Sequence, residues 1–318
     1  MNFLLSLLSG VISVLFFFTS LFSPVTGQSI KVKDEDNIKL CFVTISDTHI
    51  NNSPARNTML THGFEVLSQD CIDAIVHTGD MTDHGELSEF EDLYKCVKDG
   101  VDGPMFLPCV GNHDTWSDLG PEASYSYFVD FYNDYSGRNI EKNYYSTEIN
   151  GYKIIVMSSE GDSTRADISA EQIAWLDSEL ADATANGMPA FVICHWVIAG
   201  TNGEAELWPE DATSRQSAEV EEVLQKYKNV FYFSGHIHSG FRGELTMKTQ
   251  GHASVETHGN VHYINLPSYM YFNADGGNLI SGCGYIVEVY DDCVMLRARN
   301  YAMEHWMGIY DVTIDLVK

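Results

Sequence analysis

Short apolar runs alternate with segments of helical periodicity over the first two thirds of the chain. An apolar run of about five residues that ends in polar or glycine residues is typical of a buried strand. The sequence predicts strands at 40–45, 72–77, 105–110, 190–194 and 230–233, and helices at 56–69, 86–97 and 217–227. Strands that alternate with helices favour β-α-β units, and therefore an α/β fold with parallel inner strands.

Two local signals sharpen this pattern. Asn150-Gly151 lies between two apolar runs, and this dipeptide favours a two-residue hairpin because both positions tolerate positive φ. Ser169 and Gln172 have the spacing of a capping box, which predicts a helix that begins there and runs to Ala185. Beyond residue 240 the pattern is mainly strands, at 261–266, 285–290 and 294–298. No repeat or proline-rich linker divides the chain, so we expect one domain over residues 28–318 with two sheets.

The first residues form a separate segment. Residues 3–22 are uncharged and mostly apolar, and small residues at Val25 and Gly27 suit cleavage before Gln28. The alternative is an uncleaved anchor, because the segment lacks a basic start and about 20 apolar residues can span a bilayer. Both interpretations of residues 1–27 place the protein outside the cytosol, secreted or extracytoplasmic, with membrane contact only through this anchor.

The net charge limits which molecules the protein can bind, and the cysteine content limits which disulfides it can form. The chain has 45 acidic and 18 basic residues and a formal net charge of −27. Affinity for duplex nucleic acid comes mainly from cationic contacts, so we expect a small substrate and no duplex nucleic acid. An exported protein can form disulfides, and seven cysteines leave at least one outside any pair. The candidate pairs are Cys71–Cys96 and Cys283–Cys293. The oligomeric state does not follow from the sequence.

Chemistry-bearing side chains follow five successive predicted strands. In α/β sheets the carboxyl ends of strands form the edge at which ligands bind. Carboxylate and amide oxygens and imidazole nitrogens are the ligands of manganese, iron and zinc. The five segments are Asp47-Thr48-His49, Gly79-Asp80, Gly111-Asn112-His113-Asp114, Cys194-His195 and Gly235-His236-Ile237-His238.

A single buried histidine is usually a hydrogen-bonded core group, and that alternative applies to each of these residues alone. Five of the 12 histidines nevertheless fall in this ordered series, which coincidence explains poorly. In an extended segment positions i and i+2 point the same way, so Asp47 and His49 can share a metal, as can His236 and His238. We assign structural roles to the other histidines, His62, His77, His84, His252, His258, His262 and His305.

The ordered series resembles the pattern of the calcineurin-like metallophosphoesterase superfamily, over residues 40–240, and is most similar to its bacterial cyclic-nucleotide phosphodiesterase branch. The resemblance implies a four-layer α/β/β/α sandwich with a dinuclear metal site at the carboxyl ends of the strands. It implies two ions of manganese, iron or zinc and a hydroxide between them that attacks phosphorus. One ion would be held by Asp47, His49, Asp80 and His238, and the other by Asp80, Asn112, His195 and His236. His113 would stabilise the transition state or protonate the leaving oxygen, and Asp83 would orient His113.

Two residues differ from those of related phosphatases and limit the range of expected substrates. His84 stands where protein phosphatases carry an arginine that grips phosphate with two hydrogen bonds, and Asp83 stands where purple acid phosphatases carry a tyrosine. We therefore expect a phosphodiesterase with some monoesterase activity. The alternatives are a phosphomonoesterase or nucleotidase of the same fold, and a non-catalytic metal-binding surface protein. Trp116 and Trp196 follow site residues and either stack on a base or sugar or pack beneath loops; the loops at 115–142 and 197–214 would select the substrate.

Overall fold

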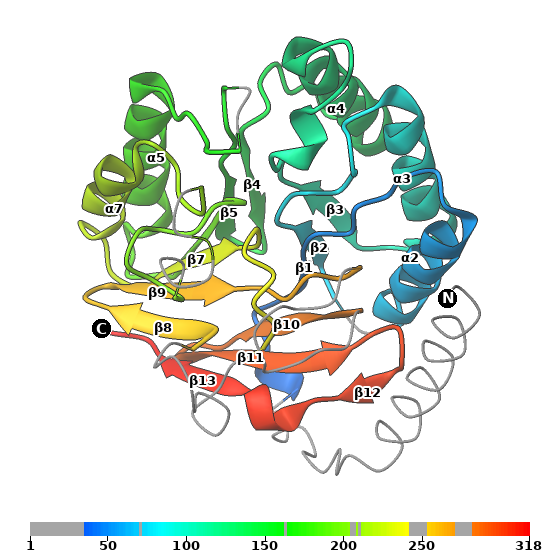
Figure 1. The fold of residues 1–318 in the computed structure, drawn as a ribbon. Coiled ribbons are helices and arrows are strands. Elements are labelled where there is room, and N and C mark those ends of the chain that lie inside the picture. The colour runs from blue at the N-terminus through cyan, green and yellow to red at the C-terminus, as the bar shows by residue number, and fades with distance from the viewer. Residues whose placement is uncertain are drawn as a thin grey trace, which may run out of the picture.

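The computed structural model describes residues 35–69, 72–161, 164–203, 208, 211–241, 253–270 and 282–318. Two sheets pack face to face, and helices cover the outer face of each (Figure 1). This confirms the predicted α/β fold with four layers. The leader at 1–27 and Cys71 lie outside the described residues, and none of the described helices is long and apolar enough to cross a membrane.

The first sheet is built around β1 (Leu40–Ile45). Its inner strands are parallel, because β1 pairs with β2 (Ala74–His77) and β2 with β3 (Met105–Pro108) in the same direction. On the other side β1 pairs antiparallel with β10 (Cys283–Val289), which pairs with β11 (Cys293–Asn300). The remaining members are β12 (His305–Trp306) and β13 (Val312–Asp315), which both pair with β11. The short 3-10 helices are η1 (Glu35–Asn37), η2 (His113–Thr115) and η3 (Gly308–Tyr310).

The second sheet has the order β4-β5-β6-β7-β9-β8. Its strands are β4 (Tyr145–Ile149), β5 (Tyr152–Val156), β6 (Ala190–Ile193), β7 (Val230–Ser234), β8 (Val255–His258) and β9 (Val261–Asn265). The helices α2 (Pro54–Leu67), α3 (Leu87–Gly100) and α4 (Pro121–Ser136) cover the first sheet, whereas α5 (Ala170–Ala183) and α7 (Ser217–Leu224) cover the second (Figure 1).

Aromatic side chains join the two sheets. Phe42 of β1 packs edge-on against Phe191 of β6, with ring centroids 5.1 Å apart, and lies 6.0 Å from Phe233 of β7. All three are fully buried. Burial of a phenylalanine side chain contributes roughly 1.5–3 kcal/mol, so this contact holds the sheets in a fixed relation. The carboxyl ends of strands from both sheets consequently meet at one edge.

The hairpin and the helix start illustrate how local signals work. Asn150 and Gly151 adopt φ values of 53° and 83°, as a two-residue turn between β4 and β5 requires. Ser169 caps α5 by accepting a hydrogen bond from the Gln172 backbone at 3.1 Å. The reciprocal half of the capping box is replaced, because the Ser169 backbone donates to Glu160 at 2.8 Å while the Gln172 side chain is buried against Ser158.

Two expectations were wrong. Cys283 and Cys293 form no disulfide, because Cys283 pairs in register with Asn300 and therefore lies at the far end of the β10–β11 hairpin from Cys293. The expected loop at 115–142 contains α4, which begins at Pro121 and ends before Gly137. Proline in the first turn and a left-handed glycine after the last are helix signals, but aromatic residues distributed around α4 obscure its periodicity.

Candidate metal centre and active site

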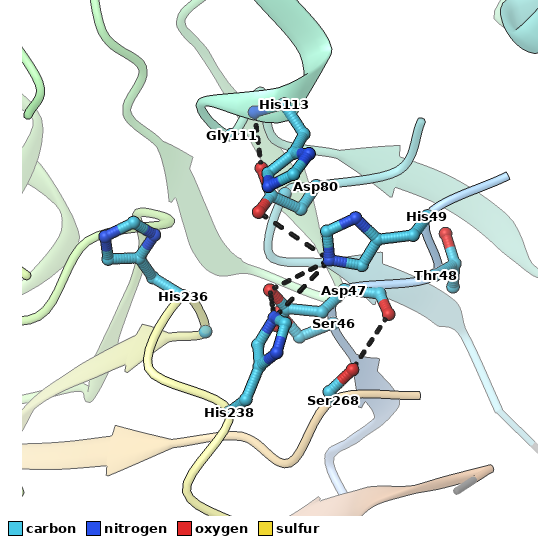
Figure 2. Close-up of polar contacts among 12 residues, drawn as sticks. Ser46, Asp47, Thr48, His49, Asp80, Gly111, His113, His236, His238 and Ser268 are labelled. Atoms are coloured by element: carbon cyan, nitrogen blue, oxygen red, sulfur yellow. Dashed lines mark hydrogen bonds and ion pairs between the residues drawn. The ribbon is translucent and has the colours of Figure 1, made fainter. Parts of the chain in front are cut away.

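The candidate residues lie in loops that follow β1, β2, β3, β6 and β7. Figure 2 shows residues of four of these loops, those after β1, β2, β3 and β7, facing one another. Most of the candidate side chains in these loops are buried although they are polar or ionisable, and His113 and His238 are partly exposed. Each candidate from the sequence lies directly after a strand: Asp47 and His49 follow β1, Asp80 follows β2, Asn112 and His113 follow β3, His195 follows β6, and His236 and His238 follow β7.

The first donor group consists of Asp47, His49, Asp80 and His238, whose ligand atoms all lie within 4.8 Å of one another. His238 Nε2 lies 3.0 Å from Asp47 Oδ1 and 3.4 Å from His49 Nε2. His49 Nε2 lies 3.8 Å from Asp80 Oδ2. Two ligands that share one metal at about 2.1 Å lie roughly 3–3.4 Å apart, so the group is spaced to hold an ion with little adjustment.

The second donor group consists of Asp80, His195 and His236. His195 Nε2 lies 3.1 Å from Asp80 Oδ2 and 3.2 Å from His236 Nδ1. Asp80 Oδ2 is therefore near both groups and could bridge two ions. The two groups match the two sets of protein ligands predicted from the resemblance, apart from Asn112, which offers an amide oxygen.

Two oxygen atoms beside the donor groups lack the partners that buried oxygens need. Asp47 Oδ2 and Asn112 Oδ1 are buried and have no hydrogen-bond partner among the described residues. A buried polar atom without a partner costs about 1–3 kcal/mol, and more when it is charged. Oxygen acceptors left open beside imidazole nitrogens that face inward are the donor set that a divalent metal satisfies.

The remaining nitrogens of the imidazoles are fixed from outside the groups. His195 Nδ1 lies 3.0 Å from the Thr78 carbonyl, and His236 Nε2 lies 3.0 Å from the Asp211 carbonyl. His49 Nδ1 lies 3.2 Å from Asp83 Oδ1. A ring that donates its other N–H to an oxygen presents a lone pair to the metal, so the hydrogen bonds of His195 and His236 select the tautomer that can bind, whereas the Asp83 carboxylate contacts His49 as an ion-pair partner.

Charge in the pocket is strongly perturbed. Burial would raise the pKa of Asp80, but His195 beside it lowers that pKa well below its ordinary value. Burial would likewise raise the pKa of Asp47, but His238 and His195 together lower that pKa below its ordinary value. Burial alone would lower the pKa of His195, and Asp80 raises it to about 9. Ionised carboxylates buried together require compensating positive charge, which bound cations supply.

The backbone at the ligands is left-handed. Asp47, His49, Asp80, His236 and His238 have φ values of 55°, 42°, 53°, 69° and 43°. The expectation of extended backbone, in which positions i and i+2 share a face, is therefore wrong. Asp47 and His49 do lie in one donor group, but through a conformation that non-glycine residues rarely adopt, whereas His236 and His238 lie in different donor groups. Such strain is retained where the surrounding fold enforces it, and it is common at functional sites.

Close backbone approach explains two glycines. Gly79 has φ of 104°, and a Cβ there would lie 2.7 Å from His195 Nδ1. A Cβ on Gly111 would lie 2.2 Å from Asp80 Oδ1. Any side chain at either position would displace a ligand, so the glycines of these segments are needed for packing as well as for turning.

His113 lies beside Asp80 and His49 (Figure 2), and its backbone N–H donates to Asp80 Oδ1 at 2.9 Å. Its Nδ1 lies 2.8 Å from the backbone carbonyl of Asp83. The predicted Asp83–His113 partnership is therefore made mainly through the main chain, because the Asp83 carboxylate lies 3.8 Å from His113 and only 3.2 Å from His49. The side chain of Asp83 thus contacts the candidate ligand His49, and its carbonyl contacts His113.

Two residues that support the loops of the candidate ligands were not predicted from the sequence. Asp114 is fully buried and accepts hydrogen bonds from the backbones of Thr82 and Gly111, both at 2.8 Å, so it joins two ligand loops. Burial and the nearby Asp80 raise the pKa of Asp114 to about 6. Ser268 donates to the Asp47 carbonyl at 3.2 Å (Figure 2). Asp114 belongs to a segment that the sequence singled out, whereas nothing near Ser268 in the sequence marks its role.

The tryptophans near the site differ in exposure. Trp196 is fully buried and donates to the Thr164 carbonyl at 2.6 Å, so it packs beneath a loop and has no free face for a ligand. Trp116 is 41% exposed, and its ring lies 4.0 Å from that of His113. Trp208 is also exposed and stacks on His236 at 5.1 Å. Two tryptophan rings therefore lie against histidines of the site.

Known proteins resemble the chain in sequence and in fold. A family model for calcineurin-like phosphoesterases matches residues 42–240. A 3′,5′-cyclic-nucleotide phosphodiesterase from Nostoc sp. is 27% identical over 201 residues, 63% of this chain and 64% of that protein. The match thus covers less than two thirds of the relative's length.

Two solved structures share the fold. A dimetal phosphatase from Danio rerio superposes with a TM-score of 0.60 at 11% identity, over 88% of this chain and all of that one. A purple acid phosphatase from yellow lupin (Lupinus luteus) seeds gives a TM-score of 0.63 at 13% identity, over 91% of this chain and 54% of that one. Identities this low are evidence of the fold alone.

The fold and the paired donor groups place a candidate dinuclear metal site at the edge where strands of both sheets end. The chain belongs to the calcineurin-like phosphoesterase family, whose model covers most of its length.

Proposed function

We propose that the chain is a metal-dependent phosphodiesterase that acts on small phosphoesters, with weaker monoesterase activity. The observation that carries the proposal is the pair of donor groups that share Asp80 Oδ2. One ion would be held by Asp47, His49, Asp80 and His238, and the second by Asp80, Asn112, His195 and His236. Two bound metal ions of manganese, iron or zinc would activate water and polarise the phosphoryl oxygens.

The chain's own residues have distinct roles in this reaction. Asp83 orients His49 through its carboxylate and His113 through its carbonyl. With Nδ1 of His113 occupied by that carbonyl, Nε2 is the ring atom that can deliver a proton to the leaving oxygen. The His113 side chain is 22% exposed, so a bound ester can reach it.

The environment of His84 supports a diester over a monoester. A phosphomonoester is mostly a dianion at neutral pH, whereas a diester carries one negative charge. The His84 side chain is 62% exposed, with Nδ1 3.1 Å from Glu89 Oε1, and its backbone N–H donates to Glu89 Oε2 at 2.8 Å. A histidine beside a carboxylate adds little positive charge and has no arginine fork, so the second charge of a monoester is poorly compensated here.

The relative and the surroundings point to the same substrate class. The Nostoc protein is described as a phosphodiesterase of 3′,5′-cyclic nucleotides. Trp116 offers an exposed aromatic surface next to His113 on which a nucleobase could stack. A net charge of −27 repels long polyanions, which favours a small ester over duplex nucleic acid. We also propose that the protein acts outside the cytosol, because of the apolar segment at 3–22.

Substrate preference tests this proposal. With Mn²⁺ present, kcat/KM should be at least about tenfold higher for bis(p-nitrophenyl) phosphate than for p-nitrophenyl phosphate, a difference of roughly 1.4 kcal/mol in transition-state binding. The natural counterparts, 3′,5′-cAMP and 5′-AMP, should be cleaved in the same order. Chelator-treated protein provides the blank. A strong preference for both monoesters would assign the chain to the phosphomonoesterases or nucleotidases instead.

A further inference from the structure

A fully buried histidine that is not among the candidate ligands lies between two of the ligand loops. His77 is the last residue of β2, three residues before Asp80. Its Nε2 lies 2.9 Å from Thr48 Oγ1, and its Nδ1 lies 3.2 Å from the backbone nitrogen of Gly79. Thr48 separates Asp47 from His49, and Gly79 precedes Asp80. The imidazole thus contacts both segments without touching a candidate ligand.

The direction of each hydrogen bond follows from the donors available. A backbone N–H can only donate, so Nδ1 of His77 must be the acceptor for Gly79. The neutral ring then carries its proton on Nε2 and donates it to Thr48 Oγ1. The Thr48 hydroxyl proton is directed to the Met81 carbonyl, 3.0 Å away. A chain of hydrogen bonds therefore runs from Gly79 through His77 and Thr48 to Met81.

This chain requires a neutral imidazole. Protonation of Nδ1 would place an N–H against the N–H of Gly79 and break the first link. Burial lowers the pKa of His77 to about 3, so the ring is neutral throughout the physiological range. Each polar atom of the ring has a partner, as a buried imidazole needs.

Main-chain contacts connect the same two loops. The Asp47 backbone donates to the Gly79 carbonyl at 3.0 Å, and the His49 backbone donates to the Asp80 carbonyl at 3.0 Å. These bonds align the two loops, and the side chains of Ser268 and Arg56 donate to the carbonyls of Asp47 and His49. The Thr48 side chain itself is held by His77 and by the Met81 carbonyl, between two residues at positive φ.

We propose that His77, as the Nε2-protonated tautomer, is a positioning residue that holds the loop of Asp47 and His49 in register with Asp80 and thereby raises metal affinity. The inference rests on the proposed function, because it presumes that this donor group binds an ion. Residues that orient ligands typically change metal affinity about 10–100-fold when they are replaced.

The sharpest variant is Thr48→Val, which keeps the branched shape and removes only the hydroxyl. Mn²⁺ binding to metal-free protein, measured by titration calorimetry, should weaken about tenfold. Thr48→Ser retains a hydroxyl and should bind Mn²⁺ like the wild type. The matched control is Thr257→Val. Thr257 Oγ1 lies 2.8 Å from Nδ1 of His262 in the β8–β9 hairpin, so this variant also removes a threonine–histidine contact, but one outside the loops of the candidate ligands. This control should leave Mn²⁺ affinity unchanged.

A spectroscopic readout is independent of metal binding. Long-range ¹H–¹⁵N correlation spectra of the metal-free wild type should show His77 with its proton on Nε2. Observation of the Nδ1-protonated tautomer would overturn the inference. Because this measurement uses the wild type, it is decisive even if Thr48→Val fails to fold. Equal Mn²⁺ affinity of folded Thr48→Val and wild type would also overturn it. A wild type that binds no Mn²⁺ would instead refute the proposed function, so the two failures are distinguishable.

Discussion

Replacement of Asp80 with alanine is expected to eliminate both metal ions and the hydrolytic activity. Asp80 Oδ2 lies 3.1 Å from His195 in one donor group and 3.8 Å from His49 in the other, so a single substitution removes a ligand from each. The variant also loses the acceptor of the His113 backbone N–H. We expect kcat/KM to fall by at least about 10³, a transition-state effect of roughly 4 kcal/mol.

Metal content and thermal unfolding test this expectation directly. Elemental analysis after Mn²⁺ loading and desalting should find less than one ion per chain in Asp80→Ala. Mn²⁺ should raise the unfolding temperature of the wild type, because a ligand that binds only the folded state stabilises it, but not that of the variant. Asp177→Ala is the matched control, since Asp177 of α5 pairs with Lys226, which follows α7, and belongs to neither donor group. Full metal content in Asp80→Ala would show that Asp80 is not the bridging ligand.

Replacement of His113 with glutamine should separate catalysis from metal binding. His113 is outside the two predicted ligand sets, and its Nδ1 is held by the Asp83 carbonyl. The variant should keep its metal ions and lose turnover about 10²–10⁴-fold, the usual contribution of a positioned general acid. Retained turnover would leave His113 without a catalytic role, and lost metal would make it a ligand.

The leaving group distinguishes the two roles that His113 could have. If it protonates the leaving oxygen, the loss in His113→Gln should be smaller for p-nitrophenolate, which needs little protonation, than for the ribose oxygen released from 3′,5′-cAMP. If it only stabilises charge on the phosphoryl group, both substrates should lose the same factor. His62→Gln, on the exposed part of α2, controls for a histidine substitution away from the site.

The sequence was sufficient to predict the strands that carry the site, because their apolar runs end abruptly at Asp, Asn or His. It was also sufficient to group Asp47 with His49, whereas the spacing argument that puts His236 and His238 on one metal is wrong, because the structure places them in different donor groups. The left-handed backbone of these four residues was not predictable, because tertiary contacts stabilise a conformation that local preference opposes. The sequence likewise could not show that the Asp83 carboxylate contacts His49 while its carbonyl contacts His113, because these contacts form only where loops distant in sequence meet.

Other residues show where pattern reasoning fails for physical reasons. Trp196 directly follows His195 and Trp116 lies three residues after His113, yet the first ring is buried and the second exposed, because packing decides which face of a loop is covered. His77 was assigned to the core, and it is buried there; its contacts with Thr48 and Gly79 become visible only when β1 and β2 lie side by side.

The central claim is that Asp47, His49, Asp80, Asn112, His195, His236 and His238 enclose a pair of metal ions. The most direct test is the metal content of folded wild-type protein, measured by elemental analysis after purification without chelator and again after Mn²⁺ titration and desalting. We expect about two transition-metal ions per chain. Folded protein that contains none and takes up none on titration would contradict it.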